Sequence, residues 1–470
     1  MSAAEQIATD RFVKVADIPE IVAELRTSYE AGRSRPLAWR LAQLDGLRRL
    51  IRENEQAIIE AVASDLGKPT VEAYSAEVAF TLNELELVHK NLPSWMKPER
   101  VRAPLVTQPS QGRIHKDSLG VVLIIAPWNY PFQLSIAPLI GAIAGGNCAI
   151  VKPSEVSDAT SALIARLLPH YVDSNCIRVM EGAVTETTAL LAERFDHIFY
   201  TGNGAVARIV MTAAAKHLTP VTLELGGKSP CIIDRDVDLE VACRRITWGK
   251  YYNAGQTCVA PDYILAHRDI YDEFLERMRA TIRRFFGPNP QESPDLARII
   301  NKRHHQRLSG LLDSGDIVIG GEADESECYL APTILKNVAP DSPVMSQEIF
   351  GPILPVLCID QVDDAIRFIN ARPKPLALYL FSNDRHVQDQ VIERTSSGGA
   401  TINHVWVHLA VPELPFGGVG ESGMGAYHGR STFDTFTHRK SVLSKPTFLD
   451  PAIMYPPYTA IKAKWIRRLL

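Results

Sequence analysis

Amphipathic helical patterns dominate the first hundred residues of the chain. Leu41, Leu44 and Leu47 recur at three-residue steps, which places their side chains on one face of a helix. Residues 73–89 show a second run of this kind, and prolines interrupt the pattern from residue 93 to residue 110. The chain is therefore expected to begin with helices, followed by a proline-broken connection.

From residue 120 the pattern changes to short apolar runs that alternate with helical stretches. Strands that alternate with helices are typical of βαβ units in a parallel sheet. The strands are expected at residues 121–126, 148–151, 177–180, 197–200 and 221–225, and the helices at residues 159–168, 187–192 and 205–216.

A second α/β series follows the first. It predicts helices at residues 239–252, 271–286, 365–371 and 387–394, and strands at residues 263–266 and 376–381. The predicted fold class is therefore α/β, with two open α/β domains. The proline-rich and C-terminal segments would supply a smaller element.

The composition excludes several classes of protein. The 470 residues hold 50 Lys+Arg against 54 Asp+Glu, with a net charge of -4, so the clustered basic excess of a nucleic-acid binder is missing. The seven cysteines are scattered and contain no C-x-x-C pair. This spacing argues against a disulfide framework and against a metal site, and it favours a reducing, cytoplasmic compartment.

One uncharged stretch, residues 118–151, is long enough to cross a bilayer. Pro127, Pro131 and Pro138 divide it, so we interpret it as core strands around a buried helix rather than a transmembrane anchor. The N-terminus lacks the basic and apolar regions of a secretory signal. The basic, amphipathic tail at residues 461–470 predicts a helix that packs on the surface or on a partner subunit, with a membrane-surface contact as the alternative.

A glycine-rich segment follows one predicted strand and opens a helix. Gly202, Gly204 and Ala207 give the spacing G-x-G-x-x-A. This context lets backbone N–H groups approach a pyrophosphate, although a plain tight turn fits as well. The acidic residue that usually follows a dinucleotide-binding fingerprint is not evident.

Cys258 differs from the other cysteines in its surroundings. It lies in Ala254-Gly-Gln-Thr-Cys258, after a predicted helix and a glycine break, where a thiolate can be exposed in a cleft. Most cysteines are small buried hydrophobes instead. Three others, in apolar strand-like runs, fit that description: Cys148, Cys231 and Cys358.

Two polar residues lie at the ends of predicted buried strands. Glu224 precedes Gly226 and Gly227, and burial would raise its pKa and suit it to general-base catalysis, with an inward-facing salt bridge as the alternative. Asn129 lies between two prolines and is suited to donate to an oxyanion, with simple turn capping as the alternative.

Taken together, these segments resemble the aldehyde dehydrogenase superfamily. Seven motifs occur in the family's order across nearly the whole chain: Pro-Trp-Asn129, Val151-Lys-Pro-Ser-Glu155, Thr201-Gly202, Glu224-Leu-Gly-Gly-Lys228, Gly255-Gln-Thr-Cys258, Glu348-Ile-Phe-Gly-Pro352 and Leu414-Pro-Phe-Gly-Gly418. The stretch from residue 213 to residue 250 looks like the class 3 branch, which acts on fatty and aromatic aldehydes.

The resemblance implies a role for each matching residue. Cys258 matches the nucleophile, Asn129 and the Cys258 backbone N–H match the oxyanion hole, and Glu224 matches the general base. The matches to the family's cofactor contacts are Trp128, Lys152, Glu155, Gly202, Asn203, Gly204, Leu225, Gly226, Glu348 and Phe350. Because a carboxylate at Glu155 accepts from a ribose 2′-OH and repels a 2′-phosphate, NAD is the expected cofactor, with NADP as the alternative.

The implied function is NAD(P)-dependent oxidation of an aldehyde to the carboxylic acid through a thiohemiacetal and a thioester. A CoA-acylating dehydrogenase is the alternative, and a non-catalytic binding or structural protein of this fold is a second one. The implied assembly is a homodimer. Residues 1–96 and 120–226 would form the NAD(P)-binding domain, residues 227–410 the catalytic domain, and residues 97–119 and 411–470 the bridging or oligomerisation element.

The chain departs from the class 3 pattern at two places. Ala207 stands where that pattern usually has glycine, and the substrate-side loop at residues 403–408 is bulkier and more aromatic.

Overall fold

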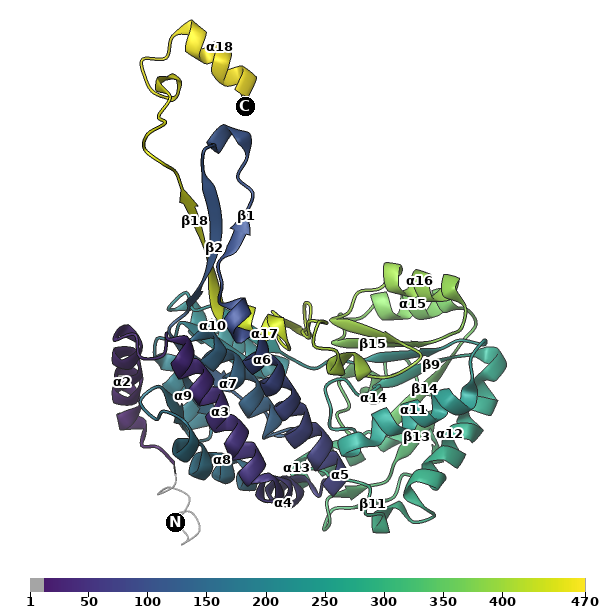
Figure 1. Cartoon of the computed structure of the whole chain (residues 1–470). Coiled ribbons are helices and arrows are strands. Elements are labelled where there is room, and N and C mark those ends of the chain that lie inside the picture. The colour runs from purple at the N-terminus through teal and green to yellow at the C-terminus, as the bar shows by residue number, and fades with distance from the viewer. Residues whose placement is uncertain (1–11, 470) are drawn as a thin grey trace.

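The computed structural model describes residues 12–469. The expectation that the chain lacks a secretory signal rests on residues 1–11, which lie outside the described residues. In the described part, the chain forms two α/β units around separate sheets, and a narrow arm rises above them (Figure 1).

The N-terminal helices form as their apolar spacing predicts. Leu44, Leu47 and Ile51 are buried on one face of α3. The helices of this region are α2 (Ile18–Glu30), α3 (Leu37–Glu53), α4 (Glu55–Leu66), α5 (Thr70–Ala73), the π-helical turn η2 (Tyr74–Ala79) and α6 (Phe80–Trp95). The expected break at Pro93 is wrong, because this proline lies in the last turn of α6, where Leu92 is fully buried and holds the helix to the core.

The first sheet has six strands in the order β17-β7-β6-β3-β4-β5, and all are parallel except β17. Its strands are β3 (Val121–Ile125), β4 (Cys148–Lys152), β5 (Ile177–Val179), β6 (His197–Thr201), β7 (Val221–Glu224) and β17 (Gly423–Met424). The predicted helices between them are confirmed as α8 (Asp158–Tyr171), α9 (Val184–Ala192) and α10 (Gly204–Ala215).

The uncharged stretch forms the centre of this unit. It folds as β3, the helix α7 (Gln133–Gly145) and β4, and every residue of these three elements is buried. The interpretation as core strands around a buried helix is therefore confirmed. No helix within residues 12–469 is long and apolar enough to cross a membrane.

The second sheet has seven strands in the order β10-β13-β14-β9-β8-β15-β16. These are β8 (Pro230–Ile233), β9 (Tyr263–His267), β10 (Asp316–Ile319), β13 (Thr333–Lys336), β14 (Ile353–Ile359), β15 (Ala377–Phe381) and β16 (Gly399–Ile402). The helices of this unit include α11 (Leu239–Tyr251), α12 (Tyr271–Phe286), α13 (Lys302–Ser309), α15 (Val362–Asn370) and α16 (Arg385–Arg394).

Cys358 does not fit the expectation of a small buried hydrophobe. It lies in β14, as the apolar run indicates, but its side chain is exposed near the end of that strand. Successive side chains of a strand point to opposite faces of the sheet, so the Cys358 side chain can face solvent although most of β14 is buried.

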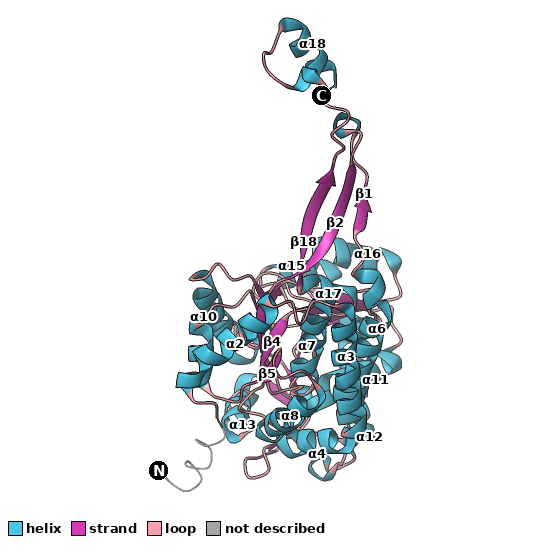
Figure 2. Cartoon of the chain, turned by 60° about the vertical axis from the view of Figure 1, so that its left-hand side comes forward, coloured by secondary structure: helices cyan, strands magenta, loops and turns pink. Residues whose placement is uncertain are grey.

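The arm joins two distant parts of the chain. The strands β1 (Glu99–Val101), β2 (Gln111–Ser118) and β18 (Thr437–Ser444) form an antiparallel sheet that projects from the body (Figure 2). The tail helix expected from the sequence is confirmed as α18 (Ala460–Leu469), and it lies beyond the tip of this arm (Figure 1). It therefore does not pack on the body of its own chain.

Candidate active site

Parallel strands of the first sheet bring four of the predicted site residues to one edge. Glu224 ends β7, Gly202 follows β6, Asn129 follows β3 and Lys152 ends β4. These strands are parallel neighbours in the order β7-β6-β3-β4. From β3 the chain adds β4 on one side and later returns to add β6 on the other side, so the order of addition changes direction between β3 and β6. Ligand sites in open α/β sheets form at this kind of switch point, outside the carboxyl ends of the strands.

Cys258 comes to the same edge from the other unit, on the loop between α11 and β9. Asn253, Ala254 and Gly255 all have positive φ, which turns the chain sharply after α11. Only glycine fits at position 255, because a Cβ there would lie 2.3 Å from the carbonyl oxygen of Gly351. The turn presents Cys258 half-buried at the edge of the first sheet.

The surroundings of the Cys258 thiol favour its neutral form. Burial, followed by the charges of Glu348 and Glu224, raises the pKa of the thiol to about 12. The N–H groups of Cys258 and Val259 donate toward the sulfur and oppose that shift. Such N–H groups can stabilise negative charge that develops at or beside the sulfur.

Asn129 links the two units at this point. Its side-chain Nδ2 donates to the carbonyl oxygen of Gln256 at 3.1 Å, and the Tyr130 hydroxyl lies 2.6 Å from Oγ1 of Thr257. The alternative of simple turn capping is wrong, because the partner of the Asn129 amide is 127 residues away. Gln256 accepts one of the two amide protons, and within residues 12–469 the second has no acceptor and can donate to a substrate oxygen.

Glu224 is 3 % exposed at the end of β7. Within residues 12–469 neither of its carboxylate oxygens has a hydrogen-bond partner, so the alternative of an inward-facing salt bridge is wrong. Burial raises the pKa of this carboxyl well above its usual range. An unpaired buried carboxyl group beside a nucleophile is costly for stability and typical of a functional site.

Glu348 lies against Gly226, two residues after Glu224. A Cβ at position 226 would approach Oε2 of Glu348 to 2.1 Å, so the carboxylate needs a glycine there. Burial and the charge of Asp262 raise the pKa of Glu348 to about 8, while the Gly227 N–H and the Lys228 charge oppose the shift.

The predicted cofactor contacts cluster along the ends of β4 and β6. Lys152 is buried, and its Nζ lies 2.6 Å from Oε2 of Glu155. Asn203 caps α10 by accepting from the N–H of Val206 at 3.0 Å, and the buried Oγ1 of Thr201 has no partner within the described residues. An ion pair, a helix N-terminus and this hydroxyl fit the ribose and phosphate groups of a dinucleotide.

Three further predicted contacts lie near the loop of Cys258. The Trp128 ring packs edge-on against Phe350, with centroids 5.3 Å apart, and against the ring of His304. Leu225 continues from Glu224, and its N–H donates to the carbonyl oxygen of Ser422 at 3.1 Å.

Sequence reasoning missed an aromatic wall beside the nucleophile. Trp248 of α11 stacks on Trp406, with centroids 4.3 Å apart, and Tyr252 meets the same ring edge-on at 5.3 Å. The wall reaches the Cys258 loop through Tyr379, whose hydroxyl accepts from the backbone N–H of Trp406 and donates to the carbonyl oxygen of Val259 at 2.5 Å. The aromatic loop at residues 403–408 was the available signal.

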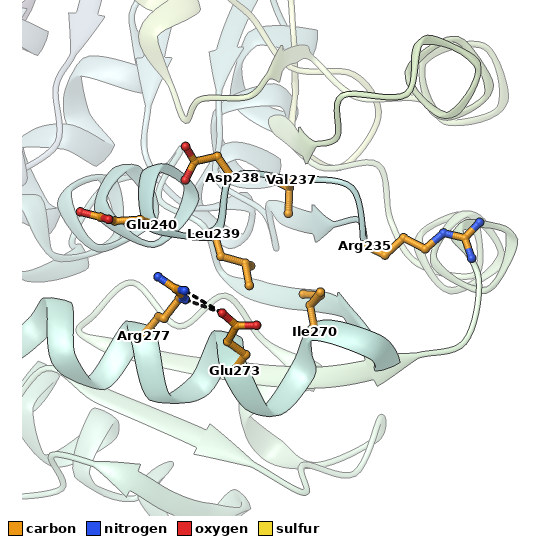
Figure 3. Close-up of a pocket in the computed structure, with 8 residues that line it drawn as sticks. All are labelled: Arg235, Val237, Asp238, Leu239, Glu240, Ile270, Glu273 and Arg277. Atoms are coloured by element: carbon orange, nitrogen blue, oxygen red, sulfur yellow. Dashed lines mark hydrogen bonds and ion pairs between the residues drawn. The ribbon is translucent and has the colours of Figure 1, made fainter.

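A separate surface pocket of about 460 Å³ lies between the starts of α11 and α12 (Figure 3). The ion pair between Arg277 and Glu273, at 2.7 Å, crosses part of it. None of the predicted site residues lines it, and the residues that do are Arg235, Val237, Asp238, Leu239, Glu240, Ile270, Glu273 and Arg277. The candidate active site is therefore the edge of the first sheet and not this pocket.

Comparisons with known proteins agree with this geometry. The model of the aldehyde dehydrogenase family matches residues 2–442 of the chain. The rat protein named "Aldehyde dehydrogenase, dimeric NADP-preferring" is 52% identical over 448 residues, which are 95% of this chain and 99% of that protein. The rat protein named "Aldehyde dehydrogenase family 3 member A2" is 52% identical over 451 residues, which are 96% of this chain and 93% of that protein.

Solved structures show the same similarity in three dimensions. The structure titled "Substrate bound state of Staphylococcus Aureus AldH" has a TM-score of 0.94 and 47% identity, and the match covers 96% of this chain and 99% of that chain. An NAD-dependent aldehyde dehydrogenase from Sinorhizobium meliloti has a TM-score of 0.86 at 28% identity, over 94% of this chain and 89% of that chain.

Proposed function

The chain belongs to the aldehyde dehydrogenase family, and from this premise we propose that Cys258, Glu224 and Asn129 carry out its reaction. The protein is an NAD(P)-dependent dehydrogenase that oxidises an aldehyde to the carboxylic acid. The family and the class 3 branch inferred from the motifs are thus confirmed. The observation that carries the catalytic assignment is the meeting of a half-buried thiol and an unpaired buried carboxyl group at one sheet edge.

In the proposed reaction, the Cys258 thiol first loses its proton to solvent, and the thiolate then attacks the aldehyde carbonyl and forms a thiohemiacetal. The free Asn129 amide proton and the Cys258 N–H donate to the oxygen that becomes negative, and loss of one such donor lowers kcat by about 10²–10³. A bound nicotinamide cofactor would supply the hydride acceptor that the thiohemiacetal on Cys258 needs to become a thioester. Glu224 then takes a proton from water, and that water releases the carboxylic acid.

Lys152 and Glu155 would hold the adenosine ribose, and Glu348 would hold the nicotinamide ribose. The Glu155 carboxylate supports NAD as the preferred cofactor, because it repels a 2′-phosphate. Its ion pair with Lys152 partly neutralises that charge, which supports use of NADP as well.

We propose fatty or aromatic aldehydes as substrates. The aromatic wall of Trp248, Trp406 and Tyr252 offers an apolar surface beside Cys258. Apolar walls with few polar groups favour a substrate with a large apolar body.

We also propose the domain division inferred from the sequence. Residues 1–96 and 120–226 form the NAD(P)-binding domain, residues 227–410 the catalytic domain, and residues 97–119 and 411–470 the bridging element. The arm supports a homodimer, as does the word "dimeric" in the name of the rat relative. A thiol that must remain reduced supports a cytoplasmic location.

The substitution Cys258→Ala tests the catalytic assignment. NAD(P)H formation with an aldehyde should fall to background, because the thiohemiacetal has no sulfur to form on. The matched control is Cys358→Ala, which removes an exposed thiol on β14 and should retain full activity. Activity that survives Cys258→Ala would overturn the assignment.

A further inference from the structure

A buried ion pair lies behind the Asn129 loop. Nζ of Lys68 and Oε1 of Glu77 are 2.8 Å apart, and both side chains are 0 % exposed. Lys68 follows α4, and Glu77 lies in the π-helical turn η2. Taking two charges out of water is unfavourable unless their remaining hydrogen-bonding groups are satisfied, so the partners of the pair indicate its purpose.

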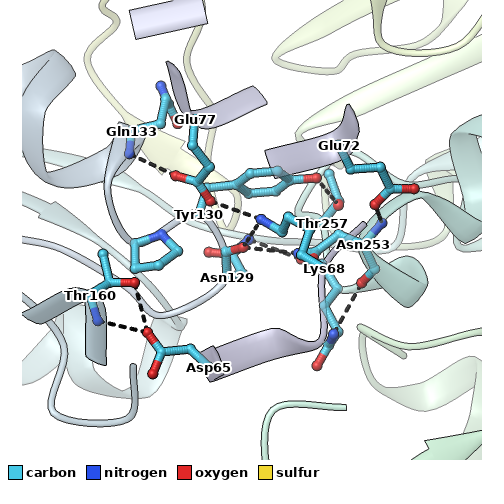
Figure 4. Close-up of polar contacts among 12 residues, drawn as sticks. Asp65, Lys68, Glu72, Glu77, Asn129, Tyr130, Gln133, Thr160, Asn253 and Thr257 are labelled. Atoms are coloured by element: carbon cyan, nitrogen blue, oxygen red, sulfur yellow. Dashed lines mark hydrogen bonds and ion pairs between the residues drawn. The ribbon is translucent and has the colours of Figure 1, made fainter. Parts of the chain in front are cut away.

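Both ions bond to the segment from Asn129 to Gln133, the first residue of α7 (Figure 4). Nζ of Lys68 donates to the carbonyl oxygen of Asn129 at 3.1 Å and lies 4.1 Å from the centroid of the Tyr130 ring. Oε2 of Glu77 accepts from the backbone N–H of Gln133 at 2.8 Å. The pair therefore holds the chain at Asn129 and at the first residue of α7.

The same segment is tied to the loop of Cys258 on its other side. The Asn129 carbonyl oxygen also accepts from Nδ2 of Asn253 at 2.9 Å, so that its two acceptor positions are filled by Lys68 and Asn253. The Asn129 side chain donates to Gln256, two residues before Cys258. Backbone and side chain of Asn129 are thus fixed between the ion pair and the nucleophile loop.

We infer that Lys68 and Glu77 are positioning residues that set the Asn129 amide at the distance an oxyanion requires. The inference rests on the proposed role of Asn129. The Asn129 amide bonds to Gln256 of the other unit, so its position relative to Cys258 depends on where the Asn129 backbone lies. A shift of that backbone would move the amide away from the place where negative charge develops on the substrate. An ion pair suits this task, since its bonds are stronger than neutral ones and resist displacement.

The variant Lys68→Met/Glu77→Gln tests the inference, because it removes both charges without leaving one of them unpaired. The rate of NADH formation in a single turnover should fall about 10²-fold, the effect expected of a small misplacement of a catalytic group. The affinity for NAD, measured by fluorescence titration, should stay within twofold of the wild-type value.

The matched control is Lys116→Met. Nζ of Lys116 is likewise in an ion pair, 2.7 Å from Oδ1 of Asp434, and its side chain is 0 % exposed, but it lies at the base of the arm. This variant should keep the wild-type single-turnover rate. If it loses rate as the double variant does, general destabilisation explains the loss and the inference is wrong.

A double-mutant cycle with Asn129→Ala decides whether the pair acts through Asn129. In the Asn129→Ala background, removal of the pair should slow the reaction less than threefold further. If the rate losses of Asn129→Ala and of the ion-pair variant multiply in full when combined, the pair acts independently of Asn129 and the inference is wrong. If Lys68→Met/Glu77→Gln does not fold, the milder Glu77→Gln takes its place in the same cycle.

The cycle also separates this inference from the proposed function. Full activity of Asn129→Ala alone overturns the role of Asn129. An impaired Asn129→Ala beside a fully active Lys68→Met/Glu77→Gln leaves that role intact and overturns only the positioning by the ion pair.

Discussion

Glu224 is buried, and neither of its carboxylate oxygens has a hydrogen-bond partner in the described part of the chain. Such a group is unfavourable in a folded chain unless another molecule, here water or substrate, completes its hydrogen bonds during the reaction. Because its pKa is raised, the Glu224 carboxyl group keeps its proton to a higher pH than an ordinary glutamate does. It acts as a base only after it loses that proton.

We therefore predict that Glu224→Gln slows deacylation and accumulates acyl-enzyme on Cys258. Mass spectrometry of the quenched reaction should show the acyl adduct after mixing with aldehyde and NAD. In the wild-type enzyme the deacylation rate should rise with pH through the raised pKa of Glu224, and this rise should be lost in the variant. An unchanged pH profile, or an acyl-CoA product formed at full rate when CoA is added, would contradict the role of Glu224 as base.

The thiol provides a second prediction at the scale of single residues. Glu348 carries its charge above pH about 8, and that charge raises the pKa of Cys258. In Glu348→Gln, iodoacetamide should alkylate Cys258 faster than in the wild type above pH 8, because the thiolate fraction is larger. Below about pH 7 the two rates should agree, since Glu348 is then protonated in the wild type.

The alkylation rate of Cys258→Ala provides the background of the other six cysteines. Equal rates of wild type and Glu348→Gln across the whole pH range would show that the two side chains do not interact.

At the scale of elements, the loop after β7 depends on a close approach between Gly226 and Glu348. A Cβ at position 226 would overlap the Glu348 carboxylate and push it from its place. We predict that Gly226→Ala weakens NAD binding about tenfold, equivalent to ~1.4 kcal/mol. Fluorescence titration measures this affinity, and Gly310→Ala, where a Cβ meets nothing closer than 3.6 Å, is the control that should bind normally.

Elements with a strong period were predictable from the sequence. The helix α12 was predicted at residues 271–286, which are its observed bounds, and the central strands were found because all of their residues are apolar except Lys152 at the end of β4. The arm strands β2 and β18 were not predicted, since they are polar and pair across more than 300 residues, with Asp117 opposite His438.

The same division applies to the active site. Cys258, Asn129 and Glu224 stand in short motifs whose order identifies the family, so sequence alone named them. Lys68 and Glu77 carry no motif, and their pairing depends on how two turns meet. One signal was present, because Glu77 lies on the buried face of its amphipathic run, where an apolar residue is expected.

At the scale of the whole molecule, the tail exposes apolar surface beyond the arm. Phe448 is 85 % exposed, Ile461 71 % and Trp465 52 %. Such side chains need a partner surface to cover them, and a second copy of the chain supplies one in the proposed homodimer.

We predict that the full chain sediments as a dimer of 52.0 kDa subunits, and that removal of residues 446–470 raises the dimer dissociation constant. Analytical ultracentrifugation over a range of concentrations measures both. A truncated chain that dimerises as tightly as the full one would show that the tail does not take part in the interface.

The pairing of β17 with β7 also has a consequence for biosynthesis. β7, which ends at Glu224, gains its outer neighbour only when residues 423–424 arrive, about 200 residues later in translation. Until then the catalytic base lies on an open sheet edge, which is a template for incorrect pairing between nascent chains. The enzyme is therefore expected to be most prone to aggregation on the ribosome, late in its synthesis, and a chaperone that shields strand edges would act in that interval.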